Sequence, residues 1–221
     1  MQAKYRMTCE DNVFVAKRNI VDYIWKSAKL EGLTVTYPDT DAIYNGMGVA
    51  NVPLDEILAV NNLKHAWQFL LENLDYAIDY PYICQLNRLV GGDTLIRDAG
   101  FPRKIPVRIG GTSWRPDMPI ESQIREQLAD VLAIPDPTES AIMLTLYLMR
   151  KQIFLDGNKR TAMLAGNHVM IAAGCGIISI PIEHQSAFRP MLLAFYESGD
   201  AGALSQFLYD HCIDGMDFDA G

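Results

Sequence analysis

The residues with the clearest capacity for chemistry lie in one short segment, Gln152 to Ala162, which reads Gln-Ile-Phe-Leu-Asp-Gly-Asn-Lys-Arg-Thr-Ala. The segment joins two stretches with helical periodicity, so we expect a tight loop that leads into the first turn of a helix. The unpaired N–H groups of that turn, at residues 157–160, and the positive end of the helix dipole favour a bound anion. The sequence therefore predicts a phosphate site.

Side chains of the same segment would complete a site for a nucleoside triphosphate. Gly157 lets the backbone approach a phosphate closely, and Arg160 can bind two phosphate oxygens in parallel. Lys159 adds a compact positive charge, and Asp156 offers a hard oxygen ligand to Mg²⁺. The pattern G-x-x-x-x-G-K-[ST] is absent, which excludes a Walker loop. The alternative is an ordinary Gly-Asn turn followed by a solvated Lys-Arg pair.

The elements around the loop are expected to be helices, because apolar residues recur with helical spacing along most of the chain. The fold class is therefore predicted to be mostly α. Gly32 supplies a left-handed stop for the first helix, and Asn51 is a possible cap for the second. The expected helices cover about 13–31, 51–74, 82–90, 119–132 and 138–152, followed by one that runs to Gly174.

One segment, Ile105 to Pro116, does not follow the helical pattern. Val107 and Ile109 alternate with other residues and precede Gly110-Gly111, which favours a β-hairpin with a permissive turn. A plain connecting loop is the alternative. No internal repeat and no Gly/Ser-rich linker divides the chain, so we expect one unit.

Composition limits the classes of partner. The 221 residues are 49% hydrophobic, enough for one well-buried core. The chain has 19 basic and 27 acidic residues, and its basic residues form no cluster in the sequence, so we expect no nucleic-acid partner. No apolar run approaches the roughly 20 residues that span a bilayer, and the polar N-terminus lacks a signal pattern, so we expect no membrane partner and a cytoplasmic location. Self-association into a homo-oligomer stays open, since amphipathic faces serve interfaces as well as cores.

Cysteine and histidine spacing gives no metal site. Cys9, Cys84, Cys175 and Cys212 form no CxxC pair, which fits a reducing compartment. The four histidines lack metal-ligand spacing, and none lies in the loop. Of these, His168 follows Arg160 on the next expected helix; we interpret it as structural rather than as a catalytic base. The histidines are His65, His168, His184 and His211.

The loop closely resembles the Fic (and Doc-like, Fido) motif H-x-F-x-[DE]-G-N-[GK]-R, with Phe154, Asp156, Gly157, Asn158, Lys159 and Arg160 in place. This resemblance implies a single Fic-type helical bundle with a small β-hairpin flap. The implied core domain covers 51–221, with the flap at about 105–116 and the phosphate-binding loop at 152–162. An N-terminal region, 1–50, would carry an inhibitory helix at about 13–32.

The resemblance implies transfer of AMP from Mg²⁺-ATP to a Ser, Thr or Tyr hydroxyl of a target protein, with ATP and Mg²⁺ as cofactors. Asn158, Arg160 and the loop amides would stabilise charge on the phosphates, and Asp156 would hold the metal. The target segment would bind along the flap by strand addition. The flap residues expected to contact it are Ile109, Gly110, Gly111, Thr112 and Trp114.

A second resemblance concerns Ser27 to Gly32, which matches the inhibitory motif [ST]-x-x-x-E-[GN] of autoinhibited Fic proteins. It implies that Glu31 pairs with Arg160 and occupies space that the ATP γ-phosphate needs. The physical basis is general, because an arginine prepared for phosphate pairs with another anion when no phosphate is bound. The alternative is a surface Ser27 and Glu31 with no such role.

Two positions depart from the family pattern. Gln152 stands where the family has a histidine that accepts the proton of the target hydroxyl, and glutamine has no basic nitrogen near neutral pH. Met163 stands where many adenylyl-transferring members have a second arginine, and Lys159 where they have glycine, as in the Doc-like branch that transfers the γ-phosphate. We favour AMP transfer; the alternatives are phosphate transfer, AMP removal assisted by Glu31, a toxin controlled by an antitoxin, and a non-catalytic ATP-binding or interaction module.

Overall fold

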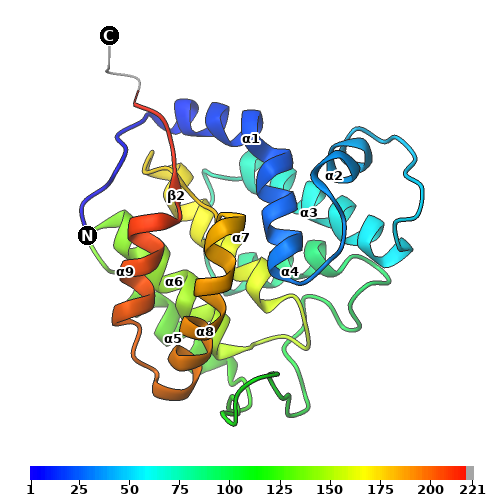
Figure 1. Cartoon of the computed structure of the whole chain (residues 1–221). Helices are drawn as coiled ribbons and strands as arrows, with labels where there is room; N and C mark the ends of the chain where they lie inside the picture. Colours follow the sequence, from blue (N-terminus) through cyan, green and yellow to red (C-terminus); the bar gives the residue numbers. More distant parts are fainter. Residues whose placement is uncertain (218–221) are drawn as a thin grey trace.

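The computed structural model describes residues 1–217 and is mostly α, as predicted (Figure 1). Residues 218–221, which end the expected core domain, lie outside the described residues. None of the helices within 1–217 is both long enough and apolar enough to cross a membrane. The helices are α1 (Cys9–Leu30), α2 (Tyr37–Tyr44), α3 (Leu54–Glu72), α4 (Tyr80–Gly91), α5 (Glu121–Leu132), α6 (Pro137–Lys151), α7 (Asn158–Ala172), α8 (Ile182–Ser198) and α9 (Gly202–His211).

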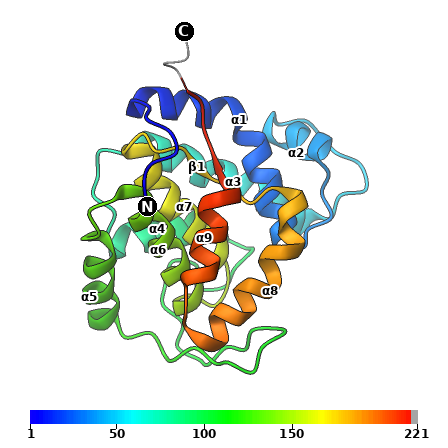
Figure 2. The same cartoon turned by 60° about the vertical axis from the view of Figure 1, so that its left-hand side comes forward.

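Helix α7 forms the centre of the bundle (Figure 1). Nearly all of its residues are buried, which is typical of a helix enclosed on every side. It packs most extensively against α6 and also contacts α1, α3 and α4. Helices α8 and α9 pack against each other, with α8 touching α1 and α9 touching α6 (Figure 2). The N-terminal end of α7, where the loop begins, is therefore held by several elements.

A short antiparallel pair of strands packs next to α7. Strand β1 (Ile177–Ile178) pairs with β2 (Ile213–Asp214), with Ile177 opposite Asp214 and Ile178 opposite Ile213. The hydroxyl of Tyr23 on α1 donates a hydrogen bond to Asp214 Oδ2 at 2.6 Å. The ladder thereby links the C-terminal part of the described chain to α1.

The first helix is longer than predicted, because Thr8 and Asp11 form a capping box that starts it at Cys9. It ends as expected: Glu31 is the C-cap, and Gly32 follows with φ 87°. The predicted cap of the next long helix is wrong, since Asn51 is left-handed (φ 62°) and Pro53 precedes α3 without a side-chain cap bond. The structure also contains α2, which the sequence analysis did not anticipate.

Residues 105–116 differ from the predicted hairpin. They form an extended loop with a turn at Gly110–Gly111, and no strand is assigned within this segment. Pro106 and Pro116 lack the N–H groups that a ladder requires. Side chains from outside the segment hold it instead of a partner strand, so the alternative of a connecting loop is the observed structure. We call residues 105–116 the flap loop.

Candidate functional site

The loop between α6 and α7 is bracketed by two left-handed residues. Gln152 ends α6 with φ 49° and ψ 56°, and Gly157 precedes α7 with φ 76°. The side chain of Asn158 closes the loop, since its Oδ1 accepts from Phe154 N at 3.0 Å and its Nδ2 donates to Phe154 O at 2.9 Å. The predicted helix, tight loop and helix are therefore confirmed.

Gly157 is required by space as well as by its backbone angle. A Cβ at this position would lie 3.0 Å from Asn87 Nδ2 and 3.0 Å from Ile96 Cδ1. Asn87 is fully buried on α4, and its Nδ2 donates to Asp156 O at 3.0 Å and to Thr161 Oγ1 at 3.1 Å. Asn87 was not among the predicted site residues, because in the sequence it is one of several polar residues of α4, between Gln85 and Arg88.

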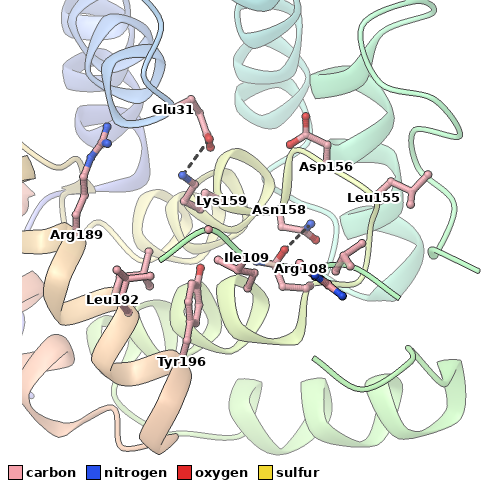
Figure 3. A pocket seen from close by; sticks show the side chains of 14 residues that line it. Glu31, Arg108, Ile109, Leu155, Asp156, Asn158, Lys159, Arg189, Leu192 and Tyr196 are labelled. Atoms are coloured by element: carbon pink, nitrogen blue, oxygen red, sulfur yellow. Dashed lines mark hydrogen bonds and ion pairs between the residues drawn. The ribbon is translucent and has the colours of Figure 1, made fainter. Parts of the chain in front are cut away.

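A cavity of about 420 Å³ opens at this loop, between the flap loop, α8 and the end of α1 (Figure 3). The expected residues Gln152, Asp156, Asn158, Lys159 and Glu31 line it, whereas Gly157 and Arg160 do not; Arg160 lines a crevice behind the cavity. Helix α8 supplies a wall that sequence reasoning missed. The remaining lining residues are Val107, Arg108, Ile109, Gly110, Leu155, Arg189, Leu192, Leu193 and Tyr196.

The charged groups of the cavity pair with one another. Lys159 Nζ lies 3.0 Å from Glu31 Oε2 (Figure 3). Arg160, which lines the crevice behind the cavity, has its Nε 3.8 Å from Glu31 Oε1. Arg160 Nη2 lies 3.5 Å from Asp156 Oδ1, so Asp156 and Arg160 face each other. The Arg160 side chain is only 8% exposed, and its Nε has no hydrogen-bond partner among the described residues. An incoming anion would thus compete with two carboxylates for these cations.

Ser27 and Gly32 lie on either side of Glu31 but do not line this cavity. Ser27 lines a narrow crevice behind it, together with Arg160 and Met163. Gly32 N donates to Lys29 O at 3.0 Å and belongs to the turn that ends α1. This turn directs Glu31 toward the first turn of α7.

The side chain at residue 152 is engaged at both ends of its amide. Gln152 Nε2 donates to Met149 O at 2.6 Å, and Gln152 Oε1 accepts from Asn158 Nδ2 at 3.2 Å. Burial, and secondarily the charge of Glu31, raises the pKa of the nearby Tyr196 phenol, so that phenol stays protonated. No histidine of the described chain lines the cavity.

His168 lies on another side of α7. Its Nε2 is 3.3 Å from Asn73 O, and its ring packs edge-on to Tyr82 with 4.8 Å between centroids. Burial lowers the pKa of His168. The interpretation of His168 as a structural residue agrees with this placement.

The flap loop is fixed to α8 by Glu197, which sequence reasoning also missed. Thr112 Oγ1 donates to Glu197 Oε1, and Ser113 N donates to the same oxygen at 3.0 Å. The bond from Thr112 Oγ1, followed by the one from Ser113 N, lowers the pKa of Glu197. Trp114 stacks on Tyr196 with centroids 5.6 Å apart. Of the five expected flap residues, Ile109 and Gly110 line the cavity, whereas Gly111, Thr112 and Trp114 contact α8.

Metal binding would depend on Asp156. Its side chain is 67% exposed, and the residue lines the cavity. Within residues 1–217, no group of three or more His, Cys, Asp or Glu side chains is arranged to hold a metal ion. Mg²⁺ commonly binds one or two carboxylates together with substrate phosphates and water, so a single carboxylate beside a phosphate site fits that ion.

Part of the chain matches a known family model. Residues 77–170 match the model of the Fic/DOC family. The chain is 28% identical over 183 residues to protein adenylyltransferase fic-1 of Caenorhabditis briggsae and 27% identical to that of Caenorhabditis elegans. Each alignment covers 77% of this chain and 35% of the relative. The chain therefore spans about a third of the length of these relatives.

Solved structures share the fold. Fic-1 (residues 134 to 508) of Caenorhabditis elegans superposes with a TM-score of 0.77 at 24% identity, covering 89% of this chain and 62% of the other. A Fic domain containing signaling protein of Bacteroides thetaiotaomicron gives a TM-score of 0.74 at 22% identity, covering 91% and 87%. At these identities the similarity establishes the arrangement of the helices.

Proposed function

We propose that the chain binds Mg²⁺-ATP in the cavity at the 152–162 loop and transfers AMP to a hydroxyl group of a target protein, as the match of residues 77–170 to the Fic/DOC family model suggests. The observation that carries this proposal is the first turn of α7: Lys159 lines a cavity walled by the flap loop, together with Asp156, and the nearly buried Arg160 reaches Asp156 from the crevice behind it. The curated relatives are named protein adenylyltransferases, which supports the reaction class.

Phosphate binding would use the N-terminal turn of α7. Its backbone N–H groups at residues 157–160 and its dipole favour an anion. Lys159 and Arg160 are already paired with carboxylates, so their charges are positioned before a ligand arrives. Asp156 would hold the Mg²⁺ ion. When bound, this ion would neutralise part of the negative charge of the triphosphate.

The reaction would begin with attack of a target hydroxyl oxygen on the α-phosphorus of ATP. The bond from the α-phosphorus to the bridging oxygen then breaks, and pyrophosphate leaves. The hydroxyl proton would pass to solvent water, because the Gln152 amide has no basic nitrogen to accept it. Loss of a general base costs roughly 10²- to 10⁴-fold in rate. Orientation by the loop and charge stabilisation by Arg160 would account for any activity that remains.

The target would lie along the flap loop. The tip of this loop is tied to Glu197, so it presents a fixed edge beside residue 152. Val107, Ile109 and Gly110 line the cavity from this edge and would sit between nucleotide and target. An extended Ser-, Thr- or Tyr-containing segment that pairs with the loop backbone would bring its hydroxyl to the α-phosphorus.

Glu31 would restrain the reaction. Its carboxylate pairs with the two cations that would bind a triphosphate, at 3.0 Å from Lys159 Nζ and 3.8 Å from Arg160 Nε. ATP binding in a productive pose requires that this carboxylate be displaced. Glu31 and the end of α1 would therefore act as an autoinhibitory element in which Ser27 and Gly32 fix the helix end.

A second candidate is a nucleotide-binding module without transfer activity. It is favoured by the two side-chain hydrogen bonds of Gln152, from Nε2 to Met149 O and to Oε1 from Asn158 Nδ2, which hold the glutamine in the loop structure. Phosphate transfer is a third candidate, favoured by Lys159 and by Met163, which faces the crevice beside Arg160. The position of the transferred label separates all three.

The test is incubation with Mg²⁺ and ATP labelled at either the α- or the γ-phosphate, in cell lysate. The parent is compared with Glu31→Gly, Gln152→His and the double variant. We expect the double variant to label proteins from α-labelled ATP, and Glu31→Gly alone to stay weak. Transfer only from γ-labelled ATP would replace AMP transfer by phosphate transfer. A double variant that binds ATP but labels nothing would support the module without transfer activity.

A further inference from the structure

Arg103 is a buried arginine whose partners are almost all backbone carbonyl groups. Only 3% of this residue is exposed. Its Nε donates to Gln152 O at 2.7 Å and its Nη1 to Ile105 O at 3.0 Å. Its Nη2 donates to Pro116 O at 3.2 Å and also to Asp117 O. The guanidinium therefore binds both ends of the flap loop and the carbonyl of residue 152 at once.

Burial of the Arg103 guanidinium costs free energy, which its hydrogen bonds must offset. Burial lowers the pKa of Arg103, with the nearby charge of Asp117 acting in the opposite direction. The side chain makes no ion pair within 4.0 Å among the described residues, so carbonyl dipoles compensate the charge. A planar group with donors in several directions suits carbonyls that come from different segments.

The carbonyl at residue 152 is free for this contact because Gln152 leaves the helix. Its left-handed conformation turns the peptide away from the α6 axis, and Arg103 Nε reaches it. The backbone N of Arg103 also donates to Ile153 O at 2.9 Å. Two consecutive carbonyls at the end of α6 are thus held by one residue at the base of the flap loop.

We infer that Arg103 is a positioning residue that couples the flap loop to the loop containing residue 152. It would thereby fix the distance and orientation between the edge of the flap loop and residue 152. Its importance for catalysis rests on the proposed function. The coupling itself does not depend on that function. Arg103 does not line the cavity itself and acts through the two segments that do.

Hydrogen exchange of the free protein tests the coupling. We compare peptides covering 105–118 and 152–158 in the parent, in Arg103→Gln and in Glu197→Gln. Arg103→Gln should raise exchange in both segments by about tenfold, because local opening reports the loss of local contacts. Glu197→Gln should loosen only the flap tip, since Glu197 binds Thr112 and Ser113 but not residue 152. Arg97→Gln, at a side chain 77% exposed, serves as the control.

Two results would overturn the inference. Exchange that rises equally across all helices in Arg103→Gln would assign to Arg103 a role in global stability only. Unchanged exchange at 152–158 would remove the coupling. Arg103→Lys tests the guanidinium itself: one ammonium cannot reach all four carbonyls, so we expect partial protection, and full protection of both segments would show that charge alone suffices.

Kinetics in the Gln152→His, Glu31→Gly background give a second readout. Arg103→Gln should lower kcat and raise KM for the target by about tenfold each, whereas Glu197→Gln should act mainly on KM. A KM effect alone in Arg103→Gln would contradict control over residue 152. If this background transfers no label, the proposed function fails, while hydrogen exchange still decides the role of Arg103.

Discussion

Lys159 Nζ lies 3.0 Å from Glu31 Oε2, closer than the 3.8 Å that separates Arg160 Nε from Glu31 Oε1. Arg160 was the expected partner of Glu31, whereas in the structure Glu31 lies near two cations, of which Lys159 is the nearer. Met163 follows Lys159 by one helical turn and carries no charge. We interpret Lys159 as the main counter-ion of the helix-end carboxylate in this chain.

A double-mutant cycle measures that ion pair. Glu31→Gln, Lys159→Met and the double variant should give a coupling free energy of about 0.5–1 kcal/mol in urea unfolding, because both side chains are partly exposed to solvent. The coupling should weaken in high salt. The Asp22–Lys26 pair on α1 is a control of similar exposure and should show about 0.3–0.5 kcal/mol. Zero coupling between Glu31 and Lys159 would contradict their pairing in solution.

Gly157 should not tolerate a side chain. Gly157→Ala places a Cβ at φ 76° against Asn87 and Ile96, and should destabilise the protein by at least about 1–2 kcal/mol. Gly48→Ala is the matched control, since nothing lies within 4 Å of its Cβ, and it should be neutral or slightly stabilising. The urea midpoints of the two variants check this; equal midpoints would refute the close packing of the loop.

Asn158 should contribute to stability by closing the loop. Asn158→Ala leaves the buried Phe154 N without its acceptor, which costs about 1–3 kcal/mol. Asn158→Asp keeps that acceptor but loses the donors to Phe154 O and Gln152 Oε1, so its effect should be smaller. Thermal unfolding ranks the variants, and an Asp variant less stable than the Ala variant would contradict this assignment of the bonds.

The attachment of the flap loop should depend on pH through Glu197. Its hydrogen bonds with Thr112 and Ser113 lower its pKa below the ordinary glutamate value of about 4.5, so the bound form favours the carboxylate. The resulting stabilisation is full above pH 4.5 and is lost as pH falls through the lower value of the folded state. Fluorescence of Trp114, in a Trp25→Phe, Trp67→Phe background, should change in that acid range. Glu197→Gln should abolish the transition, and an unaltered transition would point to another group.

The loop was predictable because its chemistry is contiguous in sequence and lies between two periodic helices. Helix starts were less accurate: Thr8 and Asp136 cap α1 and α6, and these capping bonds set the first residues. The predicted hairpin at 105–116 was wrong, because the alternation of Val107 and Ile109 does not reveal that side chains outside the segment, Arg103 and Glu197, hold it as a loop.

The wall formed by α8 also could not be found from the sequence. Leu192 and Tyr196 are apolar positions on an amphipathic helix, and periodicity does not separate cavity lining from core. Arg189 resembles a solvated arginine, yet its Nη2 donates to Leu30 O at 3.1 Å, next to Glu31. Only the packing of α8 against the end of α1 brings these residues to the cavity.

Direct titration with Mg²⁺-ATP tests whether the first turn of α7 binds a triphosphate. Calorimetry is performed on Glu31→Gly and on Glu31→Gly with Lys159→Met. We expect saturable binding of Mg²⁺-ATP to Glu31→Gly, and an affinity at least about tenfold lower when Lys159→Met is added. ATP at 100 times Kd should also raise the unfolding temperature of Glu31→Gly by an amount that corresponds to about 2.7 kcal/mol. An absence of saturable binding to folded Glu31→Gly protein would contradict triphosphate binding by this turn.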